Sequence, residues 1–172
     1  YHQLQESAQK QRYQNQAILG LMKAYFEIED YEACLNYAQE IINREMTRYL
    51  NEAELYKGKV YLMRKEYENA LAQFEYTSGL SEGETGAEAQ YMYARTLRLH
   101  KKYKESNKAC IKVRKQYESY KKWTYEAFLL LAENYLDLGN KFQAKSTLES
   151  IIEYSQDSTY IEKARERIEE LN

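Results

Sequence analysis

Residues 53–74 read AELYKGKVYLMRKEYENALAQF, and this stretch decides the fold. Small and large side chains occupy fixed places in it, namely Ala53, Gly58, Tyr61, Tyr67, Ala70 and Phe74. Within each half these residues lie three to five positions apart, which is the spacing of one helix face. The pair Lys65 and Glu66 between the halves leaves room only for a tight turn. We therefore predict two antiparallel helices that form a hairpin.

The hairpin pattern recurs along the chain. Ala17, Ala53 and Ala89 are 36 residues apart, and Ala127 follows 38 residues after Ala89. The same frame follows each alanine: Met22, Gly58, Ala94 and Ala132 five residues on; Tyr25, Tyr61, Leu97 and Tyr135 eight on; Cys34, Ala70, Ser106 and Ala144 seventeen on; Ala38, Phe74, Cys110 and Leu148 twenty-one on. Such a period is typical of stacked repeats, whose units cannot bury an apolar face alone. Small residues at these places let paired helices approach closely.

Each predicted hairpin turns at a two-residue pair: Glu29-Asp30, Lys65-Glu66, Lys101-Lys102 or Gly139-Asn140. Gly139 can adopt the left-handed conformation that ends many helices. Lys and Glu adopt it only at a cost in free energy, so we expect the other three turns to close differently.

Composition narrows the class of protein. The 172 residues contain no proline and six glycines, as uninterrupted helices require. The net charge of −2 implies neither a nucleic-acid partner nor an anionic membrane, and no apolar run is long enough for a transmembrane segment. The two cysteines, Cys34 and Cys110, fall at predicted core positions and are too few for a disulfide framework or a zinc site.

We predict one domain over residues 1–172. Its parts are the end of a preceding helix (1–14), four hairpins (15–50, 51–86, 87–124 and 125–158) and a capping helix (159–172). The strongest loop signal is the segment 78–86, which holds three glycines and is the expected flexible point. Because the chain begins with Tyr1 rather than Met, we expect a processed product or a fragment of a larger protein.

The frame resembles the tetratricopeptide repeat over residues 15–158. The residues that carry the resemblance are Gly58, Tyr61, Tyr67, Ala70 and Phe74 in the second unit, and Ala132, Tyr135, Gly139, Ala144 and Leu148 in the fourth. Glu54 and Gln90 stand where the family has an aromatic residue, and its proline is absent. The resemblance implies an all-α, right-handed α-solenoid of about four repeats with terminal helices. The alanine-rich frame is similar to a divergent bacterial branch found in cell-envelope assembly and accessory proteins.

In this family the first helix of each repeat lines a concave groove that holds the ligand. Carried over by position, the groove residues are Leu19, Lys23, Phe26, Leu55, Lys59, Leu62, Tyr91, Arg95, Arg98, Leu129 and Glu133. Lys23, Lys59 and Arg95 would form a ladder of cations beside an apolar strip, which suits a peptide or protein segment with acidic groups. The alternative is that these cations are solvated or pair with Glu52, Glu88 and Glu126.

A second candidate patch consists of Tyr117, Tyr120, Trp123 and Tyr125 around Lys121-Lys122. Its rings could stack on bases or sugars, but the favoured interpretation is packing between hairpins. Nothing indicates catalysis, a cofactor or a metal site. His2 and His100 have no metal-ligand spacing with a second His, and the glycines of residues 79–86 are not followed by the Gly-Lys-Ser/Thr of a phosphate loop.

The function that follows is a non-catalytic protein–protein interaction scaffold, part of a larger bacterial protein that acts in cell-envelope assembly or as an accessory. The alternative is a structural or oligomerisation spacer, or a sensory segment of a signalling regulator, and self-association stays open. The envelope branch favours a periplasmic location over a cytoplasmic one. We expect protein partners and no nucleic acid, and the sequence does not identify the partner.

Overall fold

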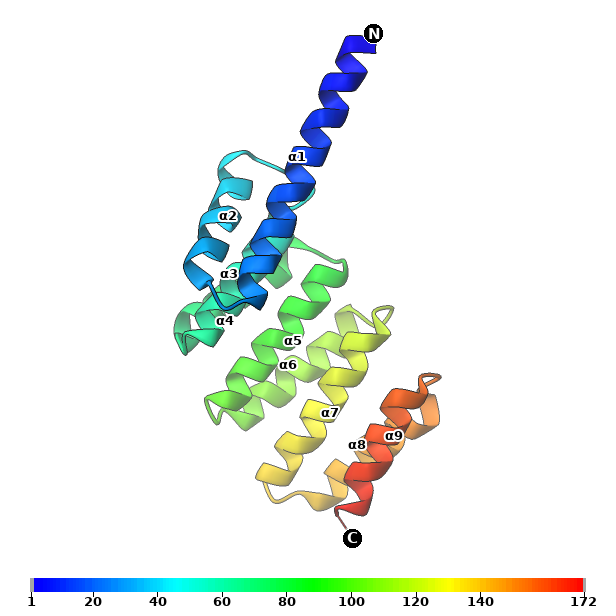
Figure 1. The fold of residues 1–172 in the computed structure, drawn as a ribbon. Coiled ribbons are helices and arrows are strands. Elements are labelled where there is room, and N and C mark those ends of the chain that lie inside the picture. The colour runs from blue at the N-terminus through cyan, green and yellow to red at the C-terminus, as the bar shows by residue number, and fades with distance from the viewer. Residues whose placement is uncertain (1, 172) are drawn as a thin grey trace. The chain divides into compact units, whose positions relative to one another are not determined.

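The computed structural model describes residues 2–171, and every regular element in that range is a helix. The helices are α1 (His2–Glu27), α2 (Tyr31–Asn43), α3 (Leu50–Met63), α4 (Tyr67–Leu80), α5 (Glu84–Leu99), α6 (Tyr103–Gln116), α7 (Lys121–Asp137), α8 (Lys141–Tyr154) and α9 (Ser158–Glu169). Antiparallel helices adjacent in the sequence pack together within each unit of the chain, with α1 on α2, α2 on α3, and α5 to α9 in order (Figure 1). The predicted fold class, an all-α solenoid of helical hairpins, is confirmed.

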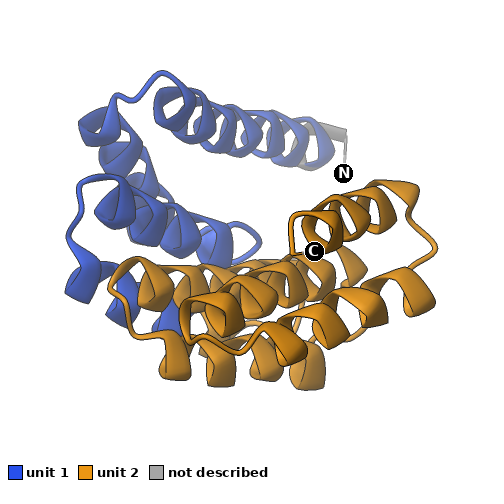
Figure 2. Cartoon of the chain, turned by 90° about the horizontal axis from the view of Figure 1, so that it is seen from below, with its two compact units in different colours: residues 1–77 blue, residues 78–172 orange. Residues whose placement is uncertain are grey.

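The chain divides into two compact units, residues 1–77 and 78–172 (Figure 2). Unit 1 contains α1 to α3 and most of α4, and unit 2 contains the last residues of α4 and α5 to α9. The division falls inside α4, at the first residue of the predicted flexible segment. That residues 1–172 form a single continuous domain stays a prediction.

The four hairpin turns share one geometry, and our expectation that three of them would differ was wrong. Glu29, Lys65 and Lys101 have φ angles of 62°, 62° and 57°, like Gly139 at 74°. At each turn the amide of this residue donates to a carbonyl three residues earlier, and the next amide donates to one five residues earlier. This pair of bonds is the Schellman motif. It satisfies the last carbonyls of the first helix, which offsets the strain of a left-handed Glu or Lys.

The residue that closes each turn also begins the next helix. Asp30 is the N-cap of α2, where its side chain accepts a hydrogen bond from the amide of Ala33 at 3.1 Å. Asn140 caps α8 in the same way through the amide of Gln143, also at 3.1 Å. At these two turns the two-residue link therefore ends one helix and caps the next, whereas Lys102 begins α6 without a side-chain cap.

Unit 1 shows why the repeat needs a small residue five positions after each alanine. Phe74 of α4 is fully buried, and its ring lies against Gly58 of α3. A Cβ atom added at Gly58 would lie 2.6 Å from the ring, far inside van der Waals contact. The first hairpin has Met22 at the equivalent place, buried with Cys34 and Ala38.

The N-terminal end differs from the prediction. We expected residues 1–14 to end a preceding helix, but His2–Glu27 is one uninterrupted helix. No residue in this stretch breaks the helix. It contains no proline, and its one glycine, Gly20, lies on the exposed side of α1. Residues 5–14 are exposed, and Tyr1 lies outside the described residues.

The glycine-rich segment 78–86 is mostly helical and not the loop that we predicted. Helix α4 continues to Leu80 and α5 begins at Glu84, so only three residues link them. Gly86 approaches the Ser81 carbonyl so closely that an added Cβ would lie 1.8 Å from its oxygen. The Tyr117 hydroxyl donates to the carbonyls of Ser78 at 2.8 Å and Ser81 at 3.2 Å. The glycines therefore permit a tight corner, which the Tyr117 hydroxyl holds in place.

The core of unit 2 ends at the helix expected to cap the chain. Helix α9 packs on α8, and Tyr160 and Ala164 join a buried cluster with Leu129 and Leu148. The Tyr125 and Tyr160 rings lie 5.3 Å apart. Helix α9 therefore packs on the last hairpin, while the boundaries of the repeats and of the capping helix stay a prediction.

Candidate functional site

Four of the predicted groove residues lie around one hollow in unit 2. It has a volume of about 520 Å³ and is formed by the first helices of two hairpins, α5 and α7, together with α9. Its walls consist of Tyr91, Arg95, Glu126, Leu129, Leu130, Glu133, Lys163, Glu166 and Arg167. The structure thus brings Tyr91, Arg95, Leu129 and Glu133 together. It adds three charged residues of α9 that the sequence analysis assigned only to a cap.

Arg98 lies about one helical turn after Arg95, but its guanidinium is paired with acidic groups of the same unit. Its guanidinium forms ion pairs with Glu133, at 3.2 Å from Nε to Oε2, and with Asp137. It also donates to the Asn134 side-chain oxygen at 3.0 Å. We predicted Arg98 as a ligand-facing residue. The structure shows that it joins α5 to α7, where a ligand would have to compete with three internal partners.

Asn134 continues this connection into the core. It is fully buried, and its amide nitrogen donates to the Ser106 hydroxyl on α6 at 2.7 Å. That hydroxyl donates to the Ala94 carbonyl on α5 at 2.8 Å. Three helices are therefore linked by one chain of hydrogen bonds directly behind the hollow. Because each buried polar group has a partner, the chain stabilises the wall that carries Arg95 and Glu133.

Helix α9 neutralises the carboxylates of α7. Arg167 forms an ion pair with Glu133, and Lys163 lies 3.6 Å from Glu126. The Tyr160 hydroxyl donates to Glu126 at 3.0 Å. Burial and the neighbouring Glu126 raise the pKa of Tyr160, so its hydroxyl keeps the proton that it donates. Sequence spacing could not reveal these pairs, because α9 lies outside the repeat period.

Two charges of the hollow have no partner among the described residues. Arg95 is exposed on α5 and forms no hydrogen bond or ion pair, and Glu166 on α9 is in the same state. Beside Arg95 lies Tyr91, whose ring packs on Trp123 at 5.5 Å. Burial, and then the charge of Glu126, raise the pKa of Tyr91 to about 12, so Tyr91 offers a neutral hydroxyl at neutral pH.

Unit 1 carries the remaining predicted groove residues, and most of them already have internal contacts. Lys23 forms an ion pair with Glu52, as the alternative interpretation expected for this pair. Lys59 lies over the Tyr56 ring at 4.5 Å, and Phe26 meets the same ring edge-on at 5.2 Å. Leu19 packs half-buried against the core.

Three predicted groove leucines are buried. Leu55, Leu62 and Leu129 keep 2%, 8% and 4% of their surface exposed. They therefore contribute packing more than open surface, because the first helices of neighbouring hairpins also contact each other along this side. A role for them in ligand contact stays a prediction.

The tyrosine-rich segment packs between hairpins, as the favoured interpretation held. Tyr117, Trp123 and Tyr125 are each at least nine-tenths buried, and Tyr120 is half-buried. The Tyr125 hydroxyl donates to the Tyr154 carbonyl at 3.2 Å. These rings therefore offer little surface on which bases or sugars could stack.

The cysteines are core residues, as predicted. Cys34 and Cys110 are free and fully buried. Burial raises the pKa of Cys34 to about 11 and that of Cys110 to about 12, so both stay thiols at neutral pH. The described part of the chain holds no cluster of His, Cys, Asp or Glu that could bind a metal ion. Across residues 2–171, no helix combines the length and the apolar character that crossing a bilayer requires.

The geometry defines an all-α solenoid of helical hairpins with a charged hollow on its first helices. Comparison with protein families agrees, because a model of the tetratricopeptide repeat matches residues 126–158, the fourth predicted unit. No curated protein sequence matches the chain. This match and the hairpins packed in order together support a protein of tetratricopeptide repeats. Such repeats are typically non-catalytic interaction modules, so the chain is a scaffold for protein–protein interaction.

Proposed function

We propose that the hollow of α5, α7 and α9 binds an extended or helical segment of a partner protein, with a carboxylate of the partner at Arg95. The observation that supports this is the selective pairing of charges. Arg98, Lys163 and Arg167 each have an acidic partner within the unit, whereas Arg95 has none among the described residues. A guanidinium can bind a carboxylate through two parallel hydrogen bonds, which gives both affinity and orientation.

The neighbours of Arg95 favour a particular kind of segment. The neutral Tyr91 hydroxyl can donate to the same carboxylate or accept from a backbone amide. Glu166 on the opposite wall also lacks a partner, so it would repel a second acidic group. We infer that the preferred segment has an acidic side chain for Arg95 and a basic side chain or a hydrogen-bond donor for Glu166.

Lys23 and Lys59 of unit 1 take a secondary part in the proposal. A ligand carboxylate at Lys23 would compete with Glu52, and one at Lys59 would add to an existing contact with Tyr56. We therefore expect Lys23 and Lys59 to add little to the contribution of Arg95. The triple variant K23E/K59E/R95E should lose little more affinity than R95E.

The test is capture of partners by the purified chain, followed by titration of the captured partner. We expect Arg95→Glu to weaken binding by at least about tenfold, since one charge pair is lost and a repulsion replaces it. The matched control is Arg165→Glu, which makes the same charge change at an exposed residue of α9 outside the hollow. Equal affinities of R95E and R165E would refute the proposed site.

For the wider role, we propose an accessory or assembly function at the bacterial cell envelope. The support is the resemblance of the alanine-rich frame to the envelope branch of the family. Fractionation of cells that express the full-length protein tests this, with recovery in the envelope fraction expected. Recovery with a soluble kinase or DNA-binding regulator would favour the alternative of a sensory segment.

A further inference from the structure

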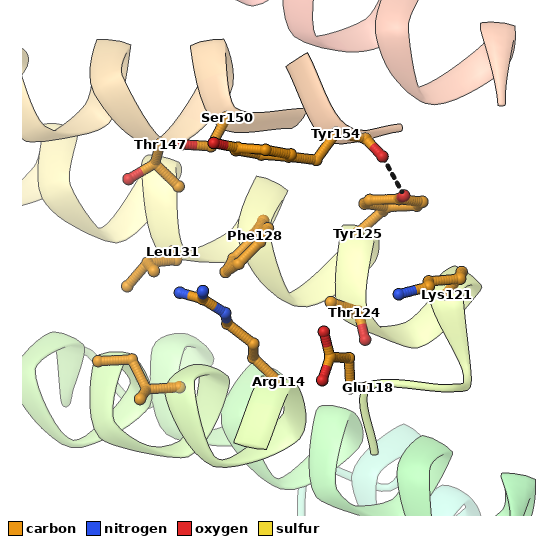
Figure 3. A pocket seen from close by; sticks show the side chains of 11 residues that line it. Arg114, Glu118, Lys121, Thr124, Tyr125, Phe128, Leu131, Thr147, Ser150 and Tyr154 are labelled. Atoms are coloured by element: carbon orange, nitrogen blue, oxygen red, sulfur yellow. Dashed lines mark hydrogen bonds between the residues drawn. The ribbon is translucent and has the colours of Figure 1, made fainter. Parts of the chain in front are cut away.

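Unit 2 has a second hollow, on the opposite face of α7 from the one described above. Its volume is about 570 Å³, and it lies between α6 and α8 with α7 as its floor (Figure 3). The α7 residues in its floor include Thr124, Phe128 and Leu131. Because an α-helix turns by about 100° per residue, these three residues face away from Glu126 and Glu133. The two hollows are therefore separate surfaces.

The floor is apolar and the rims are polar. Ile111, Phe128 and Leu131 provide aliphatic and aromatic surface, and the Tyr154 ring on α8 is 70% exposed beside them. In Figure 3 the side chain of Arg114 extends from α6 toward Phe128, and its guanidinium lies 5.7 Å from the centre of that ring. A hollow of this volume with an apolar floor fits a row of apolar side chains.

The helix that forms one rim is strongly basic. Residues 101–122 contain nine Lys or Arg and two Glu, whereas the whole chain has a net charge of −2. Within α6 the exposed cations are Lys104, Lys108, Lys112, Arg114 and Lys115. None of these has an ion pair in the described part of the chain. Arg98, Lys163 and Arg167 of unit 2, by contrast, each have an acidic partner, so the charge of α6 is left for a binding partner.

Three of the basic residues share one stripe of α6. Lys104, Lys108 and Lys115 fall within about 60° of Ile111 on the helix, so they flank the hollow on one stripe. Residues four apart on a helix are about 6 Å apart along its axis. A second helix with Glu or Asp four residues apart presents carboxylates at the same interval, and its apolar stripe can enter the hollow beside them.

We propose that this second hollow, between α6 and α8, binds an acidic amphipathic helix of a partner protein. Charge and surface chemistry together favour this occupant over nucleic acid. Stacking of bases needs successive exposed rings, but Arg114 lies over one face of Phe128, and Tyr125 is buried.

The probe is a synthetic peptide of about 18 residues with leucines on one helical stripe and glutamates four residues apart beside it. Its binding to the full chain is measured by fluorescence anisotropy, and we expect saturable binding that weakens as salt is raised. Lys104→Glu, Lys108→Glu and Lys115→Glu together should weaken it by at least about tenfold. Ser150→Trp, which fills the hollow from α8, should weaken it without any change in charge.

The controls separate this surface from the first one and from a general charge effect. The triple K10E/K145E/R165E changes the net charge equally at exposed residues outside both hollows, and it should bind within about twofold of the wild type. Arg95→Glu should likewise leave this affinity unchanged. Helix content measured by circular dichroism shows that each variant is folded.

Three outcomes would overturn the proposal. The first is no saturable binding of the peptide to the wild-type chain. The second is equal weakening by K104E/K108E/K115E and by the control triple. The third is tighter binding of an oligothymidine strand than of the peptide at about 0.15 M salt, which would assign the surface to nucleic acid.

Discussion

Replacement of Gly58 by alanine has two effects of opposite sign on the free energy of unfolding. In the interior of α3, alanine favours the helix over glycine by about 1 kcal/mol. The added Cβ, however, would lie 2.6 Å and 2.7 Å from two ring atoms of Phe74, where carbon atoms in contact are about 3.5–4.0 Å apart. Phe74 is fully buried, so the ring has to move by about 1 Å into packed neighbours.

Such overpacking typically costs about 1–3 kcal/mol. After subtraction of the gain in helix propensity, we expect Gly58→Ala to lower the free energy of unfolding by up to about 2 kcal/mol. Gly20 of α1 provides the matched control, because no atom lies within 4 Å of an added Cβ there. Gly20→Ala should therefore stabilise by about 0.5–1 kcal/mol.

Denaturant unfolding followed by circular dichroism at equilibrium measures both variants against the wild type. A third variant, Phe74→Leu in the Gly58→Ala background, should recover part of the loss because the smaller side chain makes room for the Cβ. The close contact of α3 with α4 would be refuted if G58A stabilised the chain as much as G20A does.

Four further predictions concern Asn134, Lys65 and the two cysteines. Asn134→Ala should lower the free energy of unfolding by about 1–3 kcal/mol, measured by denaturant unfolding, because it removes the hydrogen bonds to Ser106 and Arg98 from a fully buried position; an unchanged midpoint would contradict this. Lys65→Gly should be more stable than Lys65→Val by about 1–2 kcal/mol, since a β-branched residue is strained at φ 62°, and equal midpoints would refute the left-handed turn. Cys34 and Cys110 should resist a thiol reagent at pH 8 until denaturant is added, and native reactivity would show that they are accessible. Because the pKa values of both thiols are raised in the folded chain, the thiols of the unfolded chain ionise above about pH 9 while the buried ones do not. The free energy of unfolding should therefore fall as the pH rises above about 9, and a free energy that does not change with pH in this range would contradict this.

The repeat frame could be predicted from the sequence because it follows from periodic packing. Residues such as Ala53, Gly58 and Phe74 recur where two helices meet, and that requirement is the same in every hairpin. The turns at Glu29, Lys65 and Lys101 could not be predicted from residue preference. There, the hydrogen bonds of the helix end outweigh the cost of a left-handed backbone.

The candidate site was only partly predictable. Family positions identified Tyr91, Arg95, Leu129 and Glu133, which do share one hollow. The contribution of α9 was missed, because its position against α7 depends on the packing of the last hairpin and not on the repeat. Pairing also decides which cations remain available, and no spacing rule distinguishes the unpaired Arg95 from Arg98.

The basic face of α6 was missed for a different reason. Net charge averages over the whole chain, so the acidic remainder hid a local excess of Lys and Arg in residues 101–122. A charge count over short windows would have found it, while its significance depends on the hollow beside it. Local charge and surface shape therefore have to be read together.

The most direct test of the central claim is an amide chemical-shift map of the isotope-labelled chain as its captured partner is added. We predict that the largest changes lie on α5, α7 and α9, at Tyr91, Arg95 and Glu166, and that they disappear in the R95E variant. Changes confined to other helices, or a map that R95E leaves intact, would contradict the assignment of this hollow as the partner-binding site.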